Sequence, residues 1–307
     1  MRKHIIAVGG ICATTVYRVP EIAPAPAKVI ATEICELVDG MALSAACAFA
    51  QLGGTASIWA RIGDDALGRS MRDTLRAEHI DTTALRTVPQ SASSRAAVIV
   101  DARGERLVVP FHDPRTDASA DWLPLASLRD ADFVHCDARW LQGSLAALQE
   151  ARRLGMASMV DGDVAPREVL AQLLPLARYA VFSDAGLFAY TGLSELEPAL
   201  RAVARSHDGH VGASCGAAGY WWLEGGSLRH APAPTVNVVD TLAAGDVFHG
   251  ALALALVEGR PIEQAAHIAC AAASLKCTRF GGRLGCPTRA ELDAFLDRPP
   301  TVPTAGR

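Results

Sequence analysis

Paired cysteine motifs are missing from this sequence of 307 residues. Its eight cysteines include no Cys-x-x-Cys pair, and most of them lie among apolar or small residues. This pattern is typical of reduced, buried thiols, and it argues against a disulfide framework. A catalytic cysteine is the alternative, but no arrangement of cysteine and histidine supports it. The cysteines occupy positions 12, 35, 47, 136, 215, 270, 277 and 286.

Long hydrophobic runs and an excess of positive charge are also missing. No run approaches the length that crosses a bilayer, and the apolar run in the N-terminal MRKHIIAVGG is only four residues long. We expect that segment to form a first β-strand rather than a signal peptide. The 29 basic and 33 acidic residues give a net charge of −4, which argues against nucleic acid as the main partner but leaves room for a local basic pocket. We expect a soluble, cytoplasmic protein that binds neither nucleic acid nor membrane.

The chain shows no internal repeat, low-complexity tract or interdomain linker, and its length suits one large α/β domain with at most a small appendage. Buried-strand patterns alternate with helical patterns, which predicts a mostly parallel sheet covered by helices on both faces. Strands are expected at 4–10, 55–63, 131–137, 157–163, 179–184 and 210–216, with hairpins in 94–111 and 218–230. Helices are expected at 40–52, 67–79, 143–155, 166–177, 194–206 and 261–276, and the tail 298–307 is expected to be disordered.

Acids and small residues follow several of the predicted strands directly. In parallel sheets of this kind the ligand lies beyond the carboxyl ends of the strands. We therefore expect these residues to converge on one site. They are Asp137, Asp161, Asp163, Ser183, Asp184, Gly216 and Asp240.

The segment NVVDTLAAGDVFHGALALAL, residues 237–256, places a run of small residues just before an apolar helix. Free backbone N–H groups and the positive end of the helix dipole point outward at such a start, so the turn suits an anion such as phosphate. Ala243, Ala244 and Gly245 have no bulk to shield those groups. Asp246 would then take a proton from a hydroxyl that attacks the phosphate. The alternative is that Asp246 only caps the helix.

This segment resembles the signature Asp-Thr-x-Gly-Ala-Gly-Asp of the ribokinase/PfkB-type carbohydrate kinases, and the resemblance extends over essentially the whole chain. GDDALG at 63–68 is similar to the family's Gly-x-Asp-x-x-Gly, GASCGAAG at 212–219 to its phosphate-side strand end, and GGRLGCPT at 281–288 to its glycine-rich closing segment. Within the family, the chain most resembles the sulfofructose kinase branch. That resemblance is carried by DARW (137–140), DGD (161–163), FSDAGL (182–187) and KCTRFGGR (276–283).

The resemblance implies a ribokinase-like three-layer α/β sandwich, with one kinase domain over residues 1–307 and a small β-sheet lid. The lid would come from residues at about 12–36 and 93–112. Its closure over the sugar would exclude water, which otherwise competes as the nucleophile. A homodimer through the lid is also expected, because a small exposed sheet edge invites pairing.

The resemblance also implies roles for individual residues, with ATP and Mg²⁺ as cofactors and a sugar as substrate. Asp246 would be the general base, and the amides of Ala243, Ala244, Gly245 and Asp246 would form the anion hole. ATP would lie over the strand ends, with its phosphates near Ser214 and Gly216 and its adenine near 270–283. The implied ATP-binding residues are Ser183, Ser214, Gly216, Gly219, Thr241, Cys277 and Gly281.

The chain departs from the family's pattern at several of these positions. Ala243 replaces the first motif glycine, which would cost roughly 1 kcal/mol if φ is positive there. Thr14 stands where the family has a sugar-binding aspartate, whereas Asp39-Gly40 and Ser44 replace a Gly-Gly pair and an asparagine. We treat Thr14, Asp39, Gly40 and Ser44 as substrate-binding positions and hypothesise that Asp39 replaces the missing acid. The alternative is that Asp39 caps the following helix.

The family's Asn-x-x-Glu, which helps to organise Mg²⁺, is replaced by Ser183 and Gly186. Asp184 is the acid that remains close by, and it would hold the ion through water. The sulfofructose kinase branch shares this departure, so we do not interpret it as loss of activity.

Lys28 in the lid and Arg139 after a strand are candidate ligands for an anionic group on the substrate. The alternative is a surface lysine and an arginine paired with Asp137 or Asp163. The first interpretation implies an anionic, open-chain or furanose ketose. Pro110 replaces an asparagine of the sulfofructose kinase branch, which weakens the case for sulfofructose itself.

Two other functions are alternatives to the kinase. A dinucleotide-dependent oxidoreductase needs Gly-x-Gly-x-x-Gly after the first strand, where this chain has VGGICATT. A non-catalytic sugar or nucleotide sensor on the kinase fold is favoured by Thr14, Asp39 and Ala243 but opposed by the retained Asp246. Three histidines are expected to be packed or hydrogen-bonded rather than catalytic: His112, His135 and His249.

Overall fold

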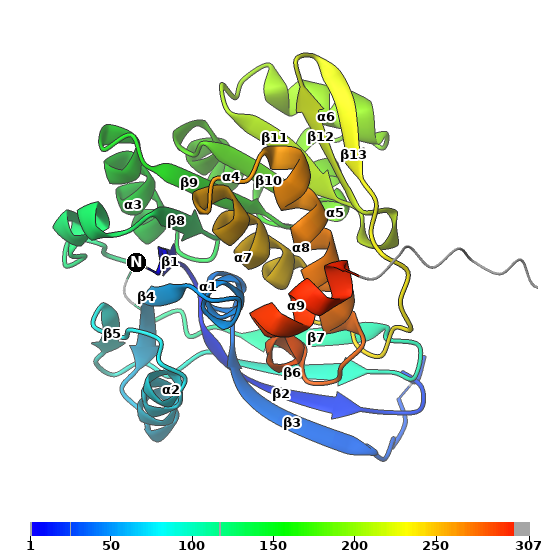
Figure 1. Cartoon of the computed structure of the whole chain (residues 1–307). Helices are drawn as coiled ribbons and strands as arrows, with labels where there is room; N and C mark the ends of the chain where they lie inside the picture. The colour runs from blue at the N-terminus through cyan, green and yellow to red at the C-terminus, as the bar shows by residue number, and fades with distance from the viewer. Residues whose placement is uncertain (1, 25, 117, 298–307) are drawn as a thin grey trace, which may run out of the picture.

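The computed structural model describes residues 2–24, 26–116 and 118–297, and a nine-stranded sheet runs through its centre (Figure 1). The strand order is β13-β12-β11-β10-β9-β8-β1-β4-β5. All neighbours from β11 to β5 pair in parallel, and β12 and β13 add an antiparallel hairpin at one edge. The strands are β1 (His4–Val8), β4 (Thr55–Gly63), β5 (Leu85–Val88), β8 (Phe133–Cys136), β9 (Ala157–Gly162), β10 (Tyr179–Ser183), β11 (His210–Ser214), β12 (Tyr220–Glu224) and β13 (Ser227–Ala231).

Strand β1 shows how the central sheet is buried on both faces. Ile5 and Ala7 belong to one hydrophobic core, whereas Ile6 and Val8 belong to a second core on the opposite face. Helices α1, α2, α7, α8 and α9 contribute to the first core, and α3 to α6 contribute to the second. The helices are α1 (Met41–Gln51), α2 (Ala66–Ala77), α3 (Leu141–Arg153), α4 (Arg167–Leu173), α5 (Asp184–Thr191), α6 (Leu196–Ala204), α7 (Ala244–Val257), α8 (Ile262–Cys277) and α9 (Arg289–Leu296).

Small residues let α7 pack closely on α1. A Cβ added at Gly250 of α7 would overlap the Ala45 carbonyl oxygen of α1 and lie 2.8 Å from the Ala48 methyl. Helix α1 is rich in alanine, and these small side chains allow the close approach. Because α7 is held between α1 and α8, its N-terminus is fixed at the carboxyl ends of the central strands.

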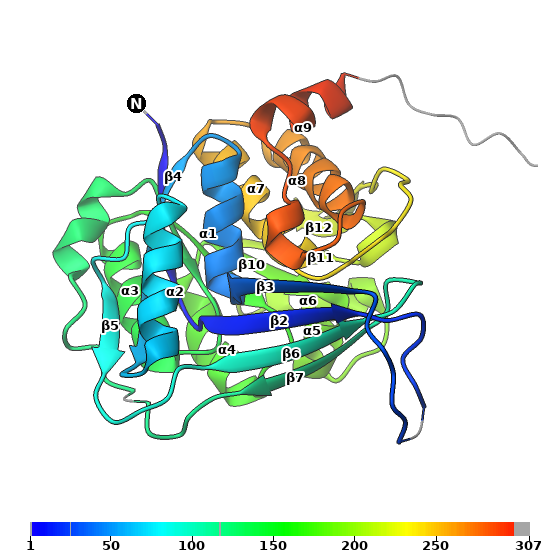
Figure 2. The same ribbon diagram turned by 90° about the horizontal axis from the view of Figure 1, so that it is seen from below.

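A second sheet of four strands, which we call sheet B, forms a separate layer beside the central sheet (Figure 2). Its order is β3-β2-β6-β7, in which β2 pairs in parallel with β6 and the other two pairs are antiparallel. Strand β3 ends at Asp39 and α1 begins at Met41, so only Gly40 separates sheet B from the helical layer. Its strands are β2 (Cys12–Arg18), β3 (Glu33–Asp39), β6 (Arg95–Val100) and β7 (Arg106–Phe111).

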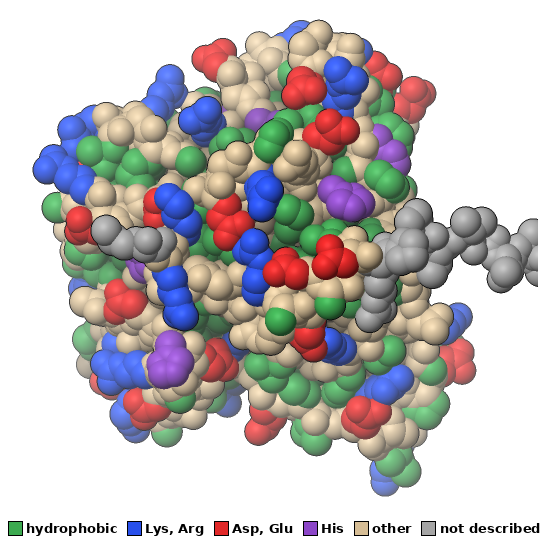
Figure 3. Space-filling view, viewed as in Figure 1, with side chains coloured by type: hydrophobic (Ala, Val, Ile, Leu, Met, Phe, Trp, Pro, Cys, Tyr) green, Lys and Arg blue, Asp and Glu red, His purple; other side chains and the backbone are tan. Residues whose placement is uncertain are grey.

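The predicted fold class is confirmed, because a mostly parallel sheet lies between helical layers and a smaller sheet accompanies it. Each expected strand, hairpin and helix range overlaps an element of the predicted kind, although the bounds differ by a few residues, whereas β5, α5 and α9 were not predicted. The tail 298–307 lies outside the described residues. All eight cysteines are free, and no helix in the described part of the chain is long and apolar enough to cross a membrane. Acidic and basic side chains are interspersed over the face shown in Figure 3.

Candidate active site

A cleft of about 320 Å³ lies between sheet B, the carboxyl ends of the central strands and the N-terminus of α7. It is the meeting point that the strand-end residues predicted, although only some of them reach it. Asp161, Asp163 and Ser183 line the cleft, and Ser214 at the end of β11 lines it too. Asp137, Asp184, Gly216 and Asp240 are not among its lining residues.

The N-terminus of α7 enters the cleft with its backbone uncovered. Ala243, just before the helix, has a left-handed backbone with a φ of 61°, and no side chain caps the helix. The first i→i−4 bond ends at the Ala243 carbonyl, so the N–H groups of Gly245 and Asp246 have no helical partner. Ala244 instead donates its N–H to the Thr241 carbonyl at 3.2 Å. A Cβ at Gly245 would meet no atom within 4 Å, so an anion can approach this turn.

Asp246 lies in the first turn of α7 and does not cap it, so the capping alternative is wrong. Its half-buried carboxyl group lines the cleft. Burial raises the pKa of Asp246 well above its usual value, and the carboxylates of Asp161, Asp39 and Asp163 raise it further. Arg106 acts in the opposite direction. The cleft therefore contains a carboxyl group with an increased affinity for a proton.

The predicted substrate-binding residues are divided between the cleft surface and the layer behind it. Thr14, Asp39 and Gly40 line the cleft, whereas Ser44 is fully buried and donates its hydroxyl to Asp39 at 2.5 Å. Asp39 ends β3, and the position before α1 belongs to Gly40, which makes no side-chain cap. The idea that Asp39 caps α1 is therefore wrong. A Cβ at Gly40, whose φ is 135°, would overlap the Gly10 carbonyl.

Basic side chains reach the cleft from sheet B and from the loop after β8. Arg139 lines the cleft, and its guanidinium lies 3.8 Å from the Asp163 carboxylate. Arg106 and His112 line it as well, and Arg106 was not among the predicted residues. Lys28 is exposed in the β2–β3 connection and is not a lining residue. Arg106 could not be selected from the sequence, because only the long-range fold of sheet B brings it to the Thr241 hydroxyl at 2.9 Å.

At the other end of the cleft lie some of the predicted ATP-binding residues. Ser183, Ser214 and Thr241 line the cleft. The Ser183 hydroxyl donates to Asp163 at 2.9 Å and accepts the Gly186 N–H of α5. Four predicted residues lie outside the cleft lining: Gly216, Gly219, Cys277 and Gly281. The proposed magnesium residue, Asp184, is exposed at the start of α5 and also lies outside that lining.

A family model for pfkB family carbohydrate kinases matches residues 3–289 of this chain. The chain belongs to the pfkB family of carbohydrate kinases. The prediction of a carbohydrate kinase is thereby confirmed.

Relatives of this carbohydrate kinase include enzymes named for different sugars. The ribokinase of Haemophilus influenzae is 27% identical over 310 residues, covering 97% of this chain and 99% of the relative. The fructokinase of Vibrio alginolyticus is 24% identical over 286 residues, covering 86% of this chain and 93% of the relative. These relatives do not select the sulfofructose kinase branch, which stays a prediction.

Solved structures agree with the fold. A candidate ribokinase from Agrobacterium tumefaciens superimposes with a TM-score of 0.92 and 38% identity, over 97% of this chain and all of the other. A candidate ribokinase II from E. coli, solved in complex with ATP and Mg²⁺, has a TM-score of 0.79 and 18% identity, over 97% of this chain and all of the other.

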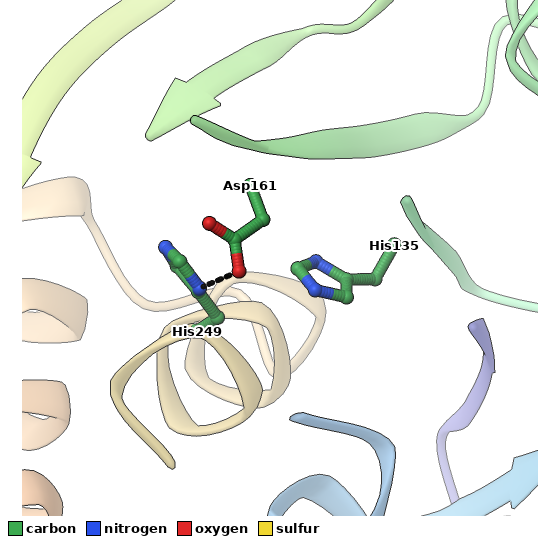
Figure 4. A group of neighbouring side chains, drawn as sticks. All are labelled: His135, Asp161 and His249. Atoms are coloured by element: carbon green, nitrogen blue, oxygen red, sulfur yellow. Dashed lines mark ion pairs between the residues drawn. The ribbon is translucent and has the colours of Figure 1, made fainter. Parts of the chain in front are cut away.

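Two histidines and an aspartate lie together at the floor of the kinase cleft (Figure 4). Asp161 of β9 and His249 of α7 line the cleft, and His249 Nδ1 lies 3.1 Å from Asp161 Oδ2. His135 of β8 is fully buried behind them, and its ring nitrogens have no hydrogen-bond partner among the described residues. Burial lowers the pKa of His135 to about 3, so its ring is neutral. Burial alone would raise the pKa of Asp161, but His249, which contacts the carboxylate, holds that pKa below its usual value.

This cluster keeps a carboxylate charge next to the Asp246 carboxyl group, and the charge contributes to the raised pKa there. Within the described residues it is also the one group of three such side chains whose potential metal-ligand atoms lie within 4.8 Å of one another. Two of its three ligands would be imidazoles, whereas Mg²⁺ prefers oxygen ligands. The cluster therefore does not suit the magnesium ion of a kinase.

Asp137 is a further buried acid, and it links three backbone segments beside the cleft. Its carboxylate accepts backbone N–H groups from Gly10, Ala42 and Arg139, at 2.7 to 3.3 Å. Burial raises the pKa of Asp137 to about 6, although the N–H groups of Arg139 and Ala42 oppose the shift. A Cβ at Gly9 would overlap this carboxylate, so glycine is needed there for a steric reason.

Proposed function

We propose that this kinase transfers the γ-phosphoryl group of ATP to a hydroxyl of a sugar, with Asp246 as general base. The observation that carries the proposal is the position of the Asp246 carboxyl group. It shares one cleft with the free backbone N–H group of Gly245, at the N-terminus of a 14-residue helix. A site that only bound phosphate would gain nothing from a carboxylate at this point, because the two charges repel each other.

In the proposed reaction, Asp246 accepts the proton of the sugar hydroxyl while the hydroxyl oxygen attacks the γ-phosphorus. The bond from that phosphorus to the bridging oxygen of ATP breaks, and ADP leaves. The proton ends on Asp246, whose raised pKa favours this transfer. The free N–H groups of Gly245 and Asp246 face the charge on the transferring group and stabilise it.

We place ATP at the end of the cleft formed by Ser183, Ser214 and Thr241, with Gly216, Gly219, Cys277 and Gly281 flanking it. Mg²⁺ would offset the phosphate charge in this arrangement. The nearby oxygen donors fit a hard cation, because Asp163 lines the cleft and Asp184 is exposed beyond Ser183. In our proposal Asp184 holds the ion through water.

For the acceptor we propose an anionic ketose, of which a sulfofructose-like sugar is one example. Arg139 and Arg106 line the cleft and would bind the anionic group, whereas Asp39 and Thr14 would bind hydroxyls. Lys28 would join them only if the β2–β3 connection moved inward, since it is exposed there. The names of the relatives include both ribokinase and fructokinase, so neutral pentoses and hexoses belong in the test.

We also propose that sheet B serves as the lid and as the contact between two copies of the chain. Arg106, Val108 and Pro110 of β7 line the cleft, whereas the alternate residues Leu107 and Val109 face away and are 47% and 56% exposed. Tyr17, Ile34 and Phe111 extend this outer apolar surface. Such a surface suits burial against a second copy.

The test measures sugar-dependent ADP release with ATP and Mg²⁺ across neutral and anionic ketoses, aldoses and nucleosides. One or more sugars should be phosphorylated by the wild type and not by Asp246→Asn. The same variant should still bind ATP and the sugar in a thermal-shift titration, because it keeps the size of the side chain. Binding of both ligands by the wild type without ADP release would support the non-catalytic sensor instead.

A further inference from the structure

Lys276 is the one lysine that this chain buries completely. Lysine occurs only at positions 3, 28 and 276, and the remaining basic residues are arginines. Lys276 lies in the last turn of α8 with 0% of its side chain exposed. Burying an ammonium group without partners costs several kcal/mol, so its contacts need an explanation.

Both the backbone and the side chain of Asp240 provide those contacts. The Lys276 ammonium donates to the Asp240 carbonyl at 2.6 Å and lies 3.3 Å from its carboxylate. The Asp240 side chain is also 0% exposed, and it accepts N–H groups from Leu242, Gly281 and Gly282 at 2.8 to 3.0 Å. Burial lowers the pKa of Lys276, and Asp240 opposes this shift.

These contacts lie directly behind the turn that would receive the phosphoryl group. Asp240 is three residues before Ala243, and one of its carboxylate oxygens fixes the Leu242 N–H between them. On the far side, the glycines that it holds belong to the segment after α8. Lys276 itself does not line the cleft, and its direct contacts with the segment before the turn are those with Asp240.

We propose that the Lys276 ammonium is a built-in cation that positions the backbone amides of the 243–246 turn for phosphoryl transfer. This inference rests on the proposed function. Lysine suits the role because its ammonium is a compact charge that donates in three directions, whereas the arginine fork is larger and planar. Because this cation is covalently attached, turnover by the wild type does not depend on which monovalent salt is present.

The test compares Lys276→Ala and Lys276→Met with Lys3→Met as the matched control. Lys3 also pairs with an aspartate, Asp132, at 2.8 Å, but on the surface. We expect both Lys276 variants to lose about 10- to 100-fold in kcat with little change in the sugar KM, because misplaced amides weaken transition-state binding. Lys3→Met should keep the wild-type kcat.

Chemical rescue separates positioning from general destabilisation. The alanine variant leaves space for a small cation beside Asp240, so ammonium, methylammonium or K⁺ should restore part of its kcat and raise its Tm by mass action. The wild type and Lys276→Met, whose methionine fills the space, should show neither effect. An unchanged kcat in the folded variants would overturn the proposal, and so would a loss that none of these cations reverses.

The melting experiment also separates this inference from the proposed function. If the wild type phosphorylates no sugar, the proposed function fails. A Tm of Lys276→Ala that rises with ammonium or K⁺, while that of Lys3→Met does not, would still establish a cation site beside Asp240. A Tm of Lys276→Ala that does not change with ammonium or K⁺ would overturn the cation site beside Asp240.

Discussion

Asp246 serves the proposed reaction at a cost to the stability of the fold. Its carboxyl group lies among Asp161, Asp39 and Asp163, which raise its pKa together with burial. A general base has to lose its proton before it can act, and that ionisation is unfavourable here. The folded-state pKa of Asp246 lies above the unfolded value of about 3.9. The protonated carboxyl group therefore gives the folded state its full stabilising effect below pH 3.9. It is lost as pH rises through the folded-state pKa.

The first prediction concerns Asp246→Asn. We expect kcat to fall by about 10³-fold, because the general base is removed. The free energy of unfolding should rise above that of the wild type at neutral and alkaline pH, and the difference should shrink towards pH 4. Chemical denaturation at several pH values, together with ADP release, measures both effects. A variant less stable than the wild type at every pH would contradict this account of the site.

The pH dependence of the wild type gives a second prediction. Because Asp246 must be ionised to accept the proton, kcat/KM should increase with pH through the raised pKa of this group. The acid limb of the profile should therefore lie above the usual aspartate value of about 3.9. A limb at or below that value would assign the base to another residue.

Asp39 provides a third prediction at the residue scale. If its carboxylate binds sugar hydroxyls, Asp39→Asn should raise the sugar KM by about 10- to 100-fold, which corresponds to one hydrogen bond with a charged partner. Ser44→Ala removes only the hydroxyl that donates to Asp39, so its KM should rise less. Steady-state kinetics measures both values. A lower Tm for Asp39→Asn with an unchanged KM would contradict the binding role.

At the scale of elements, the sequence predicted the regular parts of the fold well. The strand TASIWARIG at 55–63 coincides with β4, because a long apolar run between turn residues has one simple interpretation. The missed elements are short: β5 has four residues, and α5 and α9 have eight each. For α9 a signal was available, since Thr288 and Glu291 form a capping box at its start.

The part of the site that a local sequence motif encodes was predictable. The turn from Ala243 to Asp246 lies in the cleft as the motif indicated. The φ of Ala243 is positive, which is the condition under which replacing a glycine there was expected to cost roughly 1 kcal/mol. Arg106 and the buried Lys276–Asp240 pair were not predicted. Each depends on the packing of segments distant in sequence, and no spacing in the chain encodes that packing.

The contact between α1 and α7 leads to a fourth prediction. A side chain at Gly250 would press on the Ala45 carbonyl and the Ala48 methyl. Gly250→Val should therefore lower the free energy of unfolding by about 1 to 3 kcal/mol. The control is Ala171→Val in α4, an exposed position where only helix propensity changes. Denaturant unfolding measures both variants, and equal effects would show that the helices tolerate a wider separation.

For the whole molecule, the fifth prediction concerns self-association through sheet B. Val109→Asp places a charge in the exposed apolar surface and should convert the proposed dimer into a monomer. Leu193→Asp is the control, because Leu193 is also an exposed apolar residue, at 40%, and lies outside sheet B. Light scattering of both variants reports the mass. A wild-type mass equal to that of one chain at micromolar concentration would refute the dimer.

The alternation along β7 also limits how the protein can diverge. Successive residues of this strand face opposite sides of a sheet that is one layer thick, with Arg106 towards the cleft and Leu107 away from it. Inserting or deleting one residue there would exchange the two sets of side chains. Leu107, Val109 and Phe111 would then face the cleft, and Arg106 would lie in the outer apolar surface. New acceptor preferences should therefore evolve by replacement of residues in this strand, while its length stays fixed.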